Sequence, residues 1–222
     1  MFIGHYGVAL AAKKAAPRTS LGTLIFAAQF LDFLWPMFLL LGVEHASIVP
    51  GITKASPLDF TDYPFSHSLL MTFVWAALVG GIYFSIRRNA RGAWVVGLAV
   101  LSHWLLDFVV HRPDLPLWPG GRLRVGLGLW NSLPATIAAE GLTFGAGLYL
   151  YLTTTRARDN IGRWGFWCLM GLLAFGWVSA FFGGPPPNLA SLAWGGIAMW
   201  LTVAWGWWAD RHRELRTLPI HS

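Results

Sequence analysis

Apolar runs alternate with short polar clusters along the whole chain. Six runs are about twenty residues long, the length that an α-helix needs to cross a hydrocarbon core of about 30 Å. A shorter apolar run, residues 2–16, ends at Pro17 and predicts a short re-entrant or interfacial helix. The pattern predicts an all-α polytopic membrane helix bundle, a single domain over residues 1–222. The predicted spans are 21–43, 65–86, 92–111, 134–152, 164–183 and 189–209.

The composition agrees with a membrane protein. Hydrophobic residues make up 55% of the chain and charged residues only 12%, where a soluble domain carries about 25% charged residues. The formal net charge of +6 does not indicate nucleic acid as a partner, because the basic residues form short clusters between apolar runs. Cys168 is the single cysteine, so neither an intramolecular disulfide nor a cysteine zinc site can form.

The basic clusters predict the orientation of the chain in the membrane. Basic residues are enriched in cytoplasmic loops of membrane proteins. Twelve of the sixteen lysines and arginines fall on one predicted side, so we expect an integral membrane protein with both termini in the cytoplasm. The twelve are Lys13, Lys14, Arg18, Arg87, Arg88, Arg91, Arg156, Arg158, Arg163, Arg211, Arg213 and Arg216.

Polar groups divide the chain into two parts. Residues 153–222 form an apolar helical hairpin with no charged side chain between Trp164 and Trp208. Residues 1–152 instead carry histidines and carboxylates inside or beside the predicted spans. These are His5, Asp32, His67, His103, Asp107 and Glu140. We therefore expect the chemistry in the first part, and the last two helices offer apolar surfaces to a partner.

A polar stripe runs along the third predicted span. His103, Asp107 and His111 lie at positions i, i+4 and i+8 and therefore share one face of a helix. Charged groups inside a membrane are rare unless they pair, line a cavity or bind an ion. His111 is expected at the membrane interface, whereas His103 and Asp107 lie deeper. The two deeper groups either hydrogen-bond to neighbouring helices or form a site.

A divalent metal would explain the buried carboxylates. No lysine or arginine lies within the spans, so Asp32, Asp107 and Glu140 have only histidines, hydroxyls, water or a metal as partners. Histidine and carboxylate ligands without cysteine suit Zn²⁺ or Mn²⁺. We predict catalytic roles for Asp32 and Glu140, although Glu140 could also pair across helices as a protonated acid. The predicted metal ligands are His5, Asp32, His67, His103 and Asp107.

The motifs carrying these residues resemble the membrane-bound metal-dependent hydrolase family of small bacterial membrane proteins. The matching motifs are Gly4-His5, Asp32 in the first long helix, His67-Ser68 and the SHxxxD sequence of His103 and Asp107. The resemblance covers residues 4–125 and implies a protein of the bacterial cytoplasmic (inner) membrane that hydrolyses an ester or phosphoester of a lipid-like substrate. Leu34 replaces a second acid of the family, and DYPFSHS lacks a histidine and an arginine, so the site is expected to bind one metal instead of two, or none.

Two other functional classes remain open. The chain could be a non-catalytic accessory subunit of a larger membrane complex, bound through its last two helices and contacting haem or pigment. It could also be a carrier that uses its carboxylates as a proton or cation relay. Bound metal in the purified protein favours the hydrolase, whereas visible absorbance or co-purifying subunits favour the accessory subunit.

Overall fold

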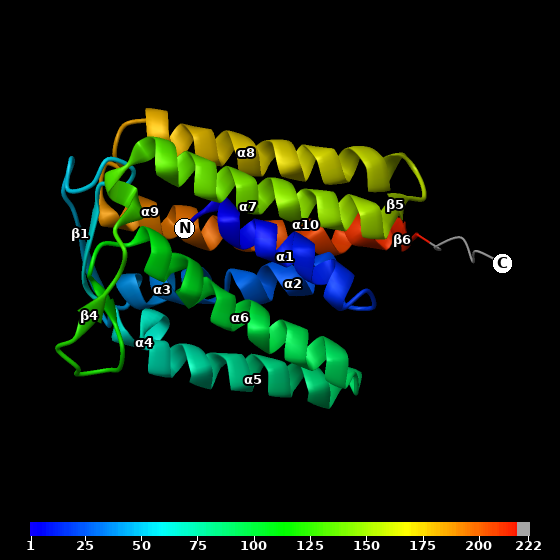
Figure 1. Cartoon of the computed structure of the whole chain (residues 1–222), viewed down its shortest axis with the longest axis horizontal. Coiled ribbons are helices and arrows are strands. Elements are labelled where there is room, and N and C mark those ends of the chain that lie inside the picture. Colours follow the sequence, from blue (N-terminus) through cyan, green and yellow to red (C-terminus); the bar gives the residue numbers. More distant parts are fainter. Residues whose placement is uncertain (217–222) are drawn as a thin grey trace.

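The computed structural model describes residues 1–216, which form an elongated bundle of nearly parallel helices (Figure 1). The chain is mostly helical, as predicted. The helices are α1 (Ile3–Ala15), α2 (Leu21–Ala28), α3 (Phe30–Leu40), α4 (Pro64–His67), α5 (Leu69–Arg87), α6 (Ala90–Val110), α7 (Leu133–Thr154), α8 (Phe166–Phe182), α9 (Leu189–Ala198) and α10 (Trp200–Arg211).

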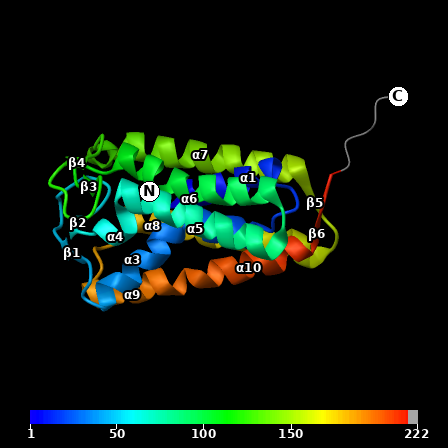
Figure 2. The same cartoon turned by 90° about the horizontal axis from the view of Figure 1, so that it is seen from below.

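Three small antiparallel sheets lie in the connections at the two ends of the bundle, so the prediction of an entirely helical chain was incomplete. One end carries β1 (His45–Ile48) paired with β2 (Leu58–Asp62), and β3 (Leu115–Pro116) paired with β4 (Arg124–Val125). The other end carries β5 (Thr155–Ala157) paired with β6 (Arg213–Leu215) (Figure 2). Each pairing satisfies backbone groups of connections that leave the helices. We call these the β1–β4 end and the β5–β6 end.

Four helical segments of residues 1–216 are long and apolar enough to cross a membrane. They are Leu69–Arg87, Ala90–Val110, Ile161–Phe182 and Leu189–Arg211. The pair α2 and α3 makes a fifth if it counts as one span, although it bends by 56°. The 22-residue α7 is not among these segments. The apolar helices fit a membrane protein, but the predicted number of six transmembrane helices is not confirmed.

Side-chain hydrogen bonds cap the N-termini of five helices. Ser20, Ser68, Asn89, Ser132 and Asn188 each accept a hydrogen bond from the backbone N–H three residues later, at the first turns of α2, α5, α6, α7 and α9. Such caps satisfy N–H groups that have no partner within the helix. Helix α1 has no side-chain cap of this kind on Phe2. Its first N–H groups must find acceptors elsewhere in the bundle.

Helix α1 lies among the other helices, with its N-terminal end nearer the β1–β4 end than the β5–β6 end (Figure 1). Most of its residues are buried, including His5 and Tyr6. Its other end is fixed by Lys13, whose Nζ lies 2.6 Å from Asp210 Oδ2 on α10. The prediction of a short N-terminal helix is confirmed, and the surrounding helices enclose it.

Helix α1 packs against α7 at a point where both helices have glycine. A Cβ atom on Gly147 would lie 2.0 Å from the Gly7 carbonyl oxygen, and one on Gly7 would lie 2.5 Å from the Thr143 carbonyl oxygen. Atoms cannot approach so closely without displacing a backbone. The two glycines therefore allow α1 to reach its central position.

Replacing Gly147 should separate α1 from α7. We expect Gly147→Ala to destabilise the protein by about 1–3 kcal/mol, the usual cost of overpacking a core. Gly145→Ala is the matched control, because a Cβ there has no atom within 4 Å. Thermal unfolding of the detergent-solubilised protein measures the difference, and equal midpoints for the two variants would contradict this packing.

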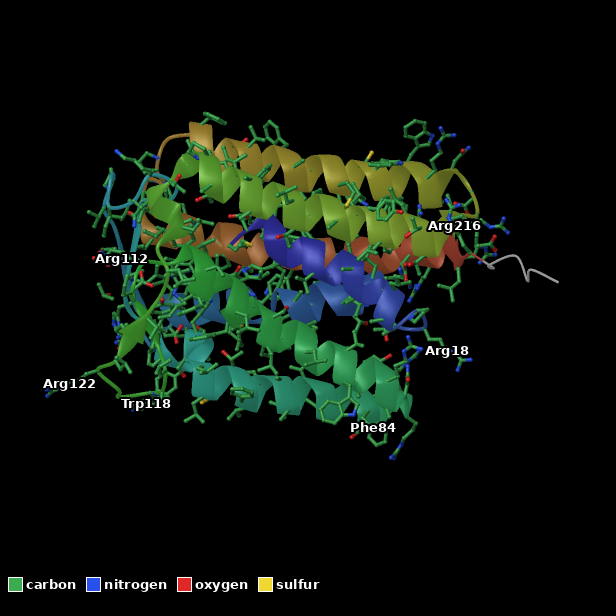
Figure 3. The ribbon with its side chains drawn as sticks, in the orientation of Figure 1. Arg18, Phe84, Arg112, Trp118, Arg122 and Arg216 are labelled. Carbon is green, nitrogen blue, oxygen red and sulfur yellow. The ribbon has the colours of Figure 1, made fainter. Side chains whose placement is uncertain are left out.

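The basic residues are divided between the ends as the charge pattern predicts, with Arg18 and Arg216 opposite Arg112 and Arg122 (Figure 3). This division generates a test of orientation in a Cys168→Ser background. Asp62→Cys at the β1–β4 end should react with a membrane-impermeant maleimide added to intact bacterial cells. Asn160→Cys at the β5–β6 end should react only after the cells are opened. Labelling of Asn160→Cys alone in intact cells would invert the predicted topology.

Candidate metal centre

Five predicted metal ligands lie together in the half of the bundle toward the β1–β4 end. His5 comes from α1, Asp32 from α3, His67 from α4, and His103 with Asp107 from α6. Two groups of three have ligand atoms within 4.8 Å of one another: His5, His103 and Asp107, and Asp32, His67 and His103. The chain therefore contains a buried His/Asp cluster that could hold a metal ion, as the sequence predicts.

The spacing of four donor atoms resembles a metal coordination sphere. His103 Nε2 lies 3.2 Å from Asp107 Oδ2 and 3.6 Å from Asp32 Oδ1. His67 Nε2 lies 3.6 Å from Asp32 Oδ1 and 3.7 Å from Asp107 Oδ2. Ligands about 2.0–2.1 Å from a tetrahedral Zn²⁺ lie about 3.3–3.4 Å from one another. The four distances between histidine nitrogens and carboxylate oxygens, 3.2–3.7 Å, are close to that spacing.

The break between α2 and α3 orients His103. The break occurs at Gln29, whereas Pro36 lies within α3. The Ala28 carbonyl oxygen lies 2.7 Å from His103 Nδ1. A carbonyl can only accept, so Nδ1 carries a proton and Nε2 faces the cluster. Nε2 is buried and has no hydrogen-bond partner in the described part of the chain, as expected for a ligand atom.

A hydrogen-bond relay orients His67 in the same way. The Ser66 hydroxyl donates to Glu44 Oε2 at 2.6 Å, so its oxygen accepts from His67 Nδ1 at 2.7 Å. The other oxygen of Glu44 accepts the backbone N–H groups of Phe65 and Ser66. The relay directs His67 Nε2 at the cluster, the arrangement that metal-ligating histidines usually show. Sequence reasoning missed Glu44 and Ser66, and the only local signal was the serine preceding His67.

His5 contacts Asp107 Oδ1, the carboxylate oxygen that faces α1. Its Nε2 lies 3.1 Å from Asp107 Oδ1, and its ring stacks on that of His103 with centroids 3.7 Å apart. The amino group of Met1 lies 2.5 Å from the same oxygen. Asp107 thus has one oxygen toward His103 and the other toward α1. His5 is in a position to orient Asp107 as well as to contribute a ligand atom.

Glu140, predicted as a catalytic residue, caps α1. Its Oε2 accepts the backbone N–H groups of Phe2 and Ile3, both at 2.9 Å. These are the N–H groups at the start of α1 that lack a cap of their own, and the positive end of the helix favours a carboxylate there. The catalytic role predicted for Glu140 has no test here, but its hydrogen bonds give it a structural one.

A cavity of about 730 Å³ connects the cluster to the β1–β4 end. Asp32, His67 and Asp107 lie at its base, and the Asp32 side chain is 40% exposed there while the other cluster side chains are almost fully buried. Its walls come from α3, the loop before β2, and the α8–α9 connection. The hairpin predicted to stand apart from the chemistry therefore forms one wall. The wall residues include Phe33, Trp35, Pro50, Leu58, Trp177, Phe181, Pro186, Leu192 and Met199.

A second polar network lies on the β1–β4 side of the cluster, just beyond the C-terminal end of α6. Asp114 Oδ1 accepts from His111 Nδ1 and from the Tyr63 hydroxyl, both at 2.9 Å. Burial raises the pKa of Tyr63, as does the neighbouring Asp114, so the phenol stays protonated and donates. Burial also lowers the pKa of His111 against the opposing hydrogen bond to Asp114, which favours a neutral imidazole.

The relay to His67 predicts an effect on metal affinity. Ser66→Ala removes the acceptor for His67 Nδ1–H and leaves the ring free to turn, so we expect Zn²⁺ affinity to fall about 10–100-fold. Ser102→Ala is the control, because Ser102 precedes His103 but its hydroxyl bonds only to the Ala99 carbonyl of its own helix. Competition with a chelator of known affinity measures both variants. An equal loss of Zn²⁺ affinity in the two variants would contradict a role of the relay in orienting His67.

Comparisons with known proteins give no relative for this chain. No family model matches it, and neither a curated protein nor a solved structure does. The resemblance to the membrane-bound metal-dependent hydrolase family stays a prediction from the motifs.

Proposed function

We propose that this protein is an integral membrane protein that holds one divalent cation, Zn²⁺ or Mn²⁺, and hydrolyses an ester or phosphoester of a lipid-like substrate. His67, His103, Asp32 and Asp107 are the proposed ligands, and His5 orients Asp107. The cation would polarise the substrate and lower the pKa of a water molecule.

The observation that carries the proposal is the convergence of donors whose protonation states suit a metal. His67 and His103 both donate Nδ1–H to a protein oxygen, so both Nε2 lone pairs point to the same place. His103 Nε2 is buried, makes no hydrogen bond within residues 1–216, and lies 3.2 Å from Asp107 Oδ2. A divalent cation there would accept the nitrogen lone pairs and neutralise the two carboxylates.

The cavity supports a lipid-like substrate. Its walls are mainly aromatic and aliphatic, and Asp32 brings a polar group to its base. Ligand sites commonly combine an apolar lining with a few polar groups. The adjoining helices expose large apolar side chains such as Phe175 and Phe182 on α8. An amphiphile could therefore place its apolar part against the walls and its ester group at the cluster.

An accessory subunit without catalysis is the rival proposal, and one observation favours it. The last three helices expose large apolar residues along their length, including Phe175, Phe182, Trp194 and Leu201. Lipid contact accounts for these residues equally well. Bound metal together with hydrolysis separates the two proposals, because a structural subunit needs neither.

Asp107→Asn tests the proposed function. The amide keeps the shape of the carboxylate but removes its negative charge, so the purified variant should lose its bound Zn²⁺ or Mn²⁺. It should also lose hydrolysis of 4-nitrophenyl esters and bis(4-nitrophenyl) phosphate. Elemental analysis and release of 4-nitrophenol measure the two effects.

Asp62→Asn is the matched control, because Asp62 is an exposed carboxylate at the β1–β4 end. It should retain full metal content and activity. Equal metal content in Asp107→Asn and wild type would refute the metal centre. Retained metal without any hydrolysis in the wild type would instead favour a structural or transport role.

A further inference from the structure

We propose that His111 is the general base of the hydrolysis and that Asp114 is its positioning residue. This inference rests on the proposed function and adds a proton-transfer group outside the metal cluster. From the sequence, His111 is expected only at the membrane interface, with no chemical role.

The pair has the geometry of an oriented imidazole. His111 Nδ1 lies 2.9 Å from Asp114 Oδ1, and a carboxylate accepts, so Nδ1 carries the proton and Nε2 the lone pair. Asp114 is held in turn by the Tyr63 hydroxyl and by Arg112 Nε at 3.3 Å. A carboxylate that fixes the tautomer of a histidine in this way is the arrangement found in hydrolytic triads.

The free nitrogen of His111 reaches the cavity. His111 is among the residues that line the cavity, and the rings of Trp130 and Phe60 lie at 4.1 and 5.0 Å from its ring. Within residues 1–216, Nε2 has no hydrogen-bond partner, yet it is not among the fully buried unpaired atoms. The packed rings hold the imidazole in place while Nε2 stays accessible from the cavity.

The other proton acceptors that line the cavity have partners or a role in the cluster. Asp32, His67 and Asp107 belong to the proposed metal centre. Glu140 uses Oε2 for two backbone N–H groups of α1. His111 is thus the imidazole of the described cavity lining that lies outside the proposed metal cluster.

The position of His111 suits proton transfer at the cluster. It caps the C-terminal end of α6, one helical turn after Asp107, so its backbone lies about 6 Å farther toward the β1–β4 end. The cavity that both residues line has room for a water molecule and an ester group. As the water oxygen bonds to the phosphorus or carbonyl carbon, its proton passes to His111 Nε2. The ester bond then breaks, its electron pair stays on the leaving oxygen, and His111 returns the proton to that oxygen.

Comparison of His111→Gln with wild type tests the role. Both proteins should bind the same amount of Zn²⁺ or Mn²⁺, because His111 is not a ligand. With bis(4-nitrophenyl) phosphate and a 4-nitrophenyl ester as probes, kcat should fall about 10²–10⁴-fold, the usual contribution of a general base. KM should stay within a few-fold. His45→Gln, an exposed histidine of β1, is the control and should leave kcat unchanged.

Chemical rescue distinguishes catalysis from packing. In His111→Ala the lost ring leaves space beside Trp130, and added imidazole should restore part of kcat. Asp114→Asn should lower kcat without changing metal content, because an amide can donate to Nδ1 and favours the wrong tautomer.

An unchanged kcat in His111→Gln would overturn the general-base role of His111. So would a lost kcat in His111→Ala that imidazole does not restore. In both cases metal-dependent hydrolysis by the wild type would still support the proposed function. No hydrolysis by the metal-loaded wild type would overturn both.

Discussion

A carboxylate buried in an apolar helix bundle must be matched by donors or cations, and this constraint determines how the centre of the molecule is built. The predicted spans contain no lysine or arginine. Asp107 therefore meets His5, His103 and the Met1 amino group, while Glu140 meets the first N–H groups of α1. The same contacts satisfy the uncapped start of α1, which would otherwise leave N–H groups without partners far from water.

The position of α1 links the packing to the chemistry. Gly7 and Gly147 let α1 approach α7 closely, and Lys13 fixes its far end to Asp210. The near end then stops beside Asp107, which places His5 against His103. The break at Gln29 contributes the Ala28 carbonyl to His103 Nδ1. Elements that look unrelated in the chain thus set the tautomers and spacing of one cluster.

The part of the site that could be predicted lies on regular helices. His103 and Asp107 follow from i, i+4 spacing, and Asp32 and His67 from polar positions in or beside apolar runs. The role of Glu140 as the cap of α1 could not be predicted, because it joins residues 137 or more apart. The relay through Glu44 likewise depends on how a loop folds. The small sheets and the cavity wall of α8 and α9 were missed for the same reason, since alternating hydrophobicity does not encode contacts between distant segments.

Metal binding by the His/Asp cluster underlies the proposed function. X-ray diffraction from crystals of the purified protein, recorded on both sides of the zinc and manganese absorption edges, tests it directly. We predict one anomalous peak about 2.0–2.2 Å from His67 Nε2, His103 Nε2 and the carboxylate oxygens of Asp32 and Asp107. The absence of a peak from zinc- or manganese-supplemented protein, or a peak only at another site, would contradict the account.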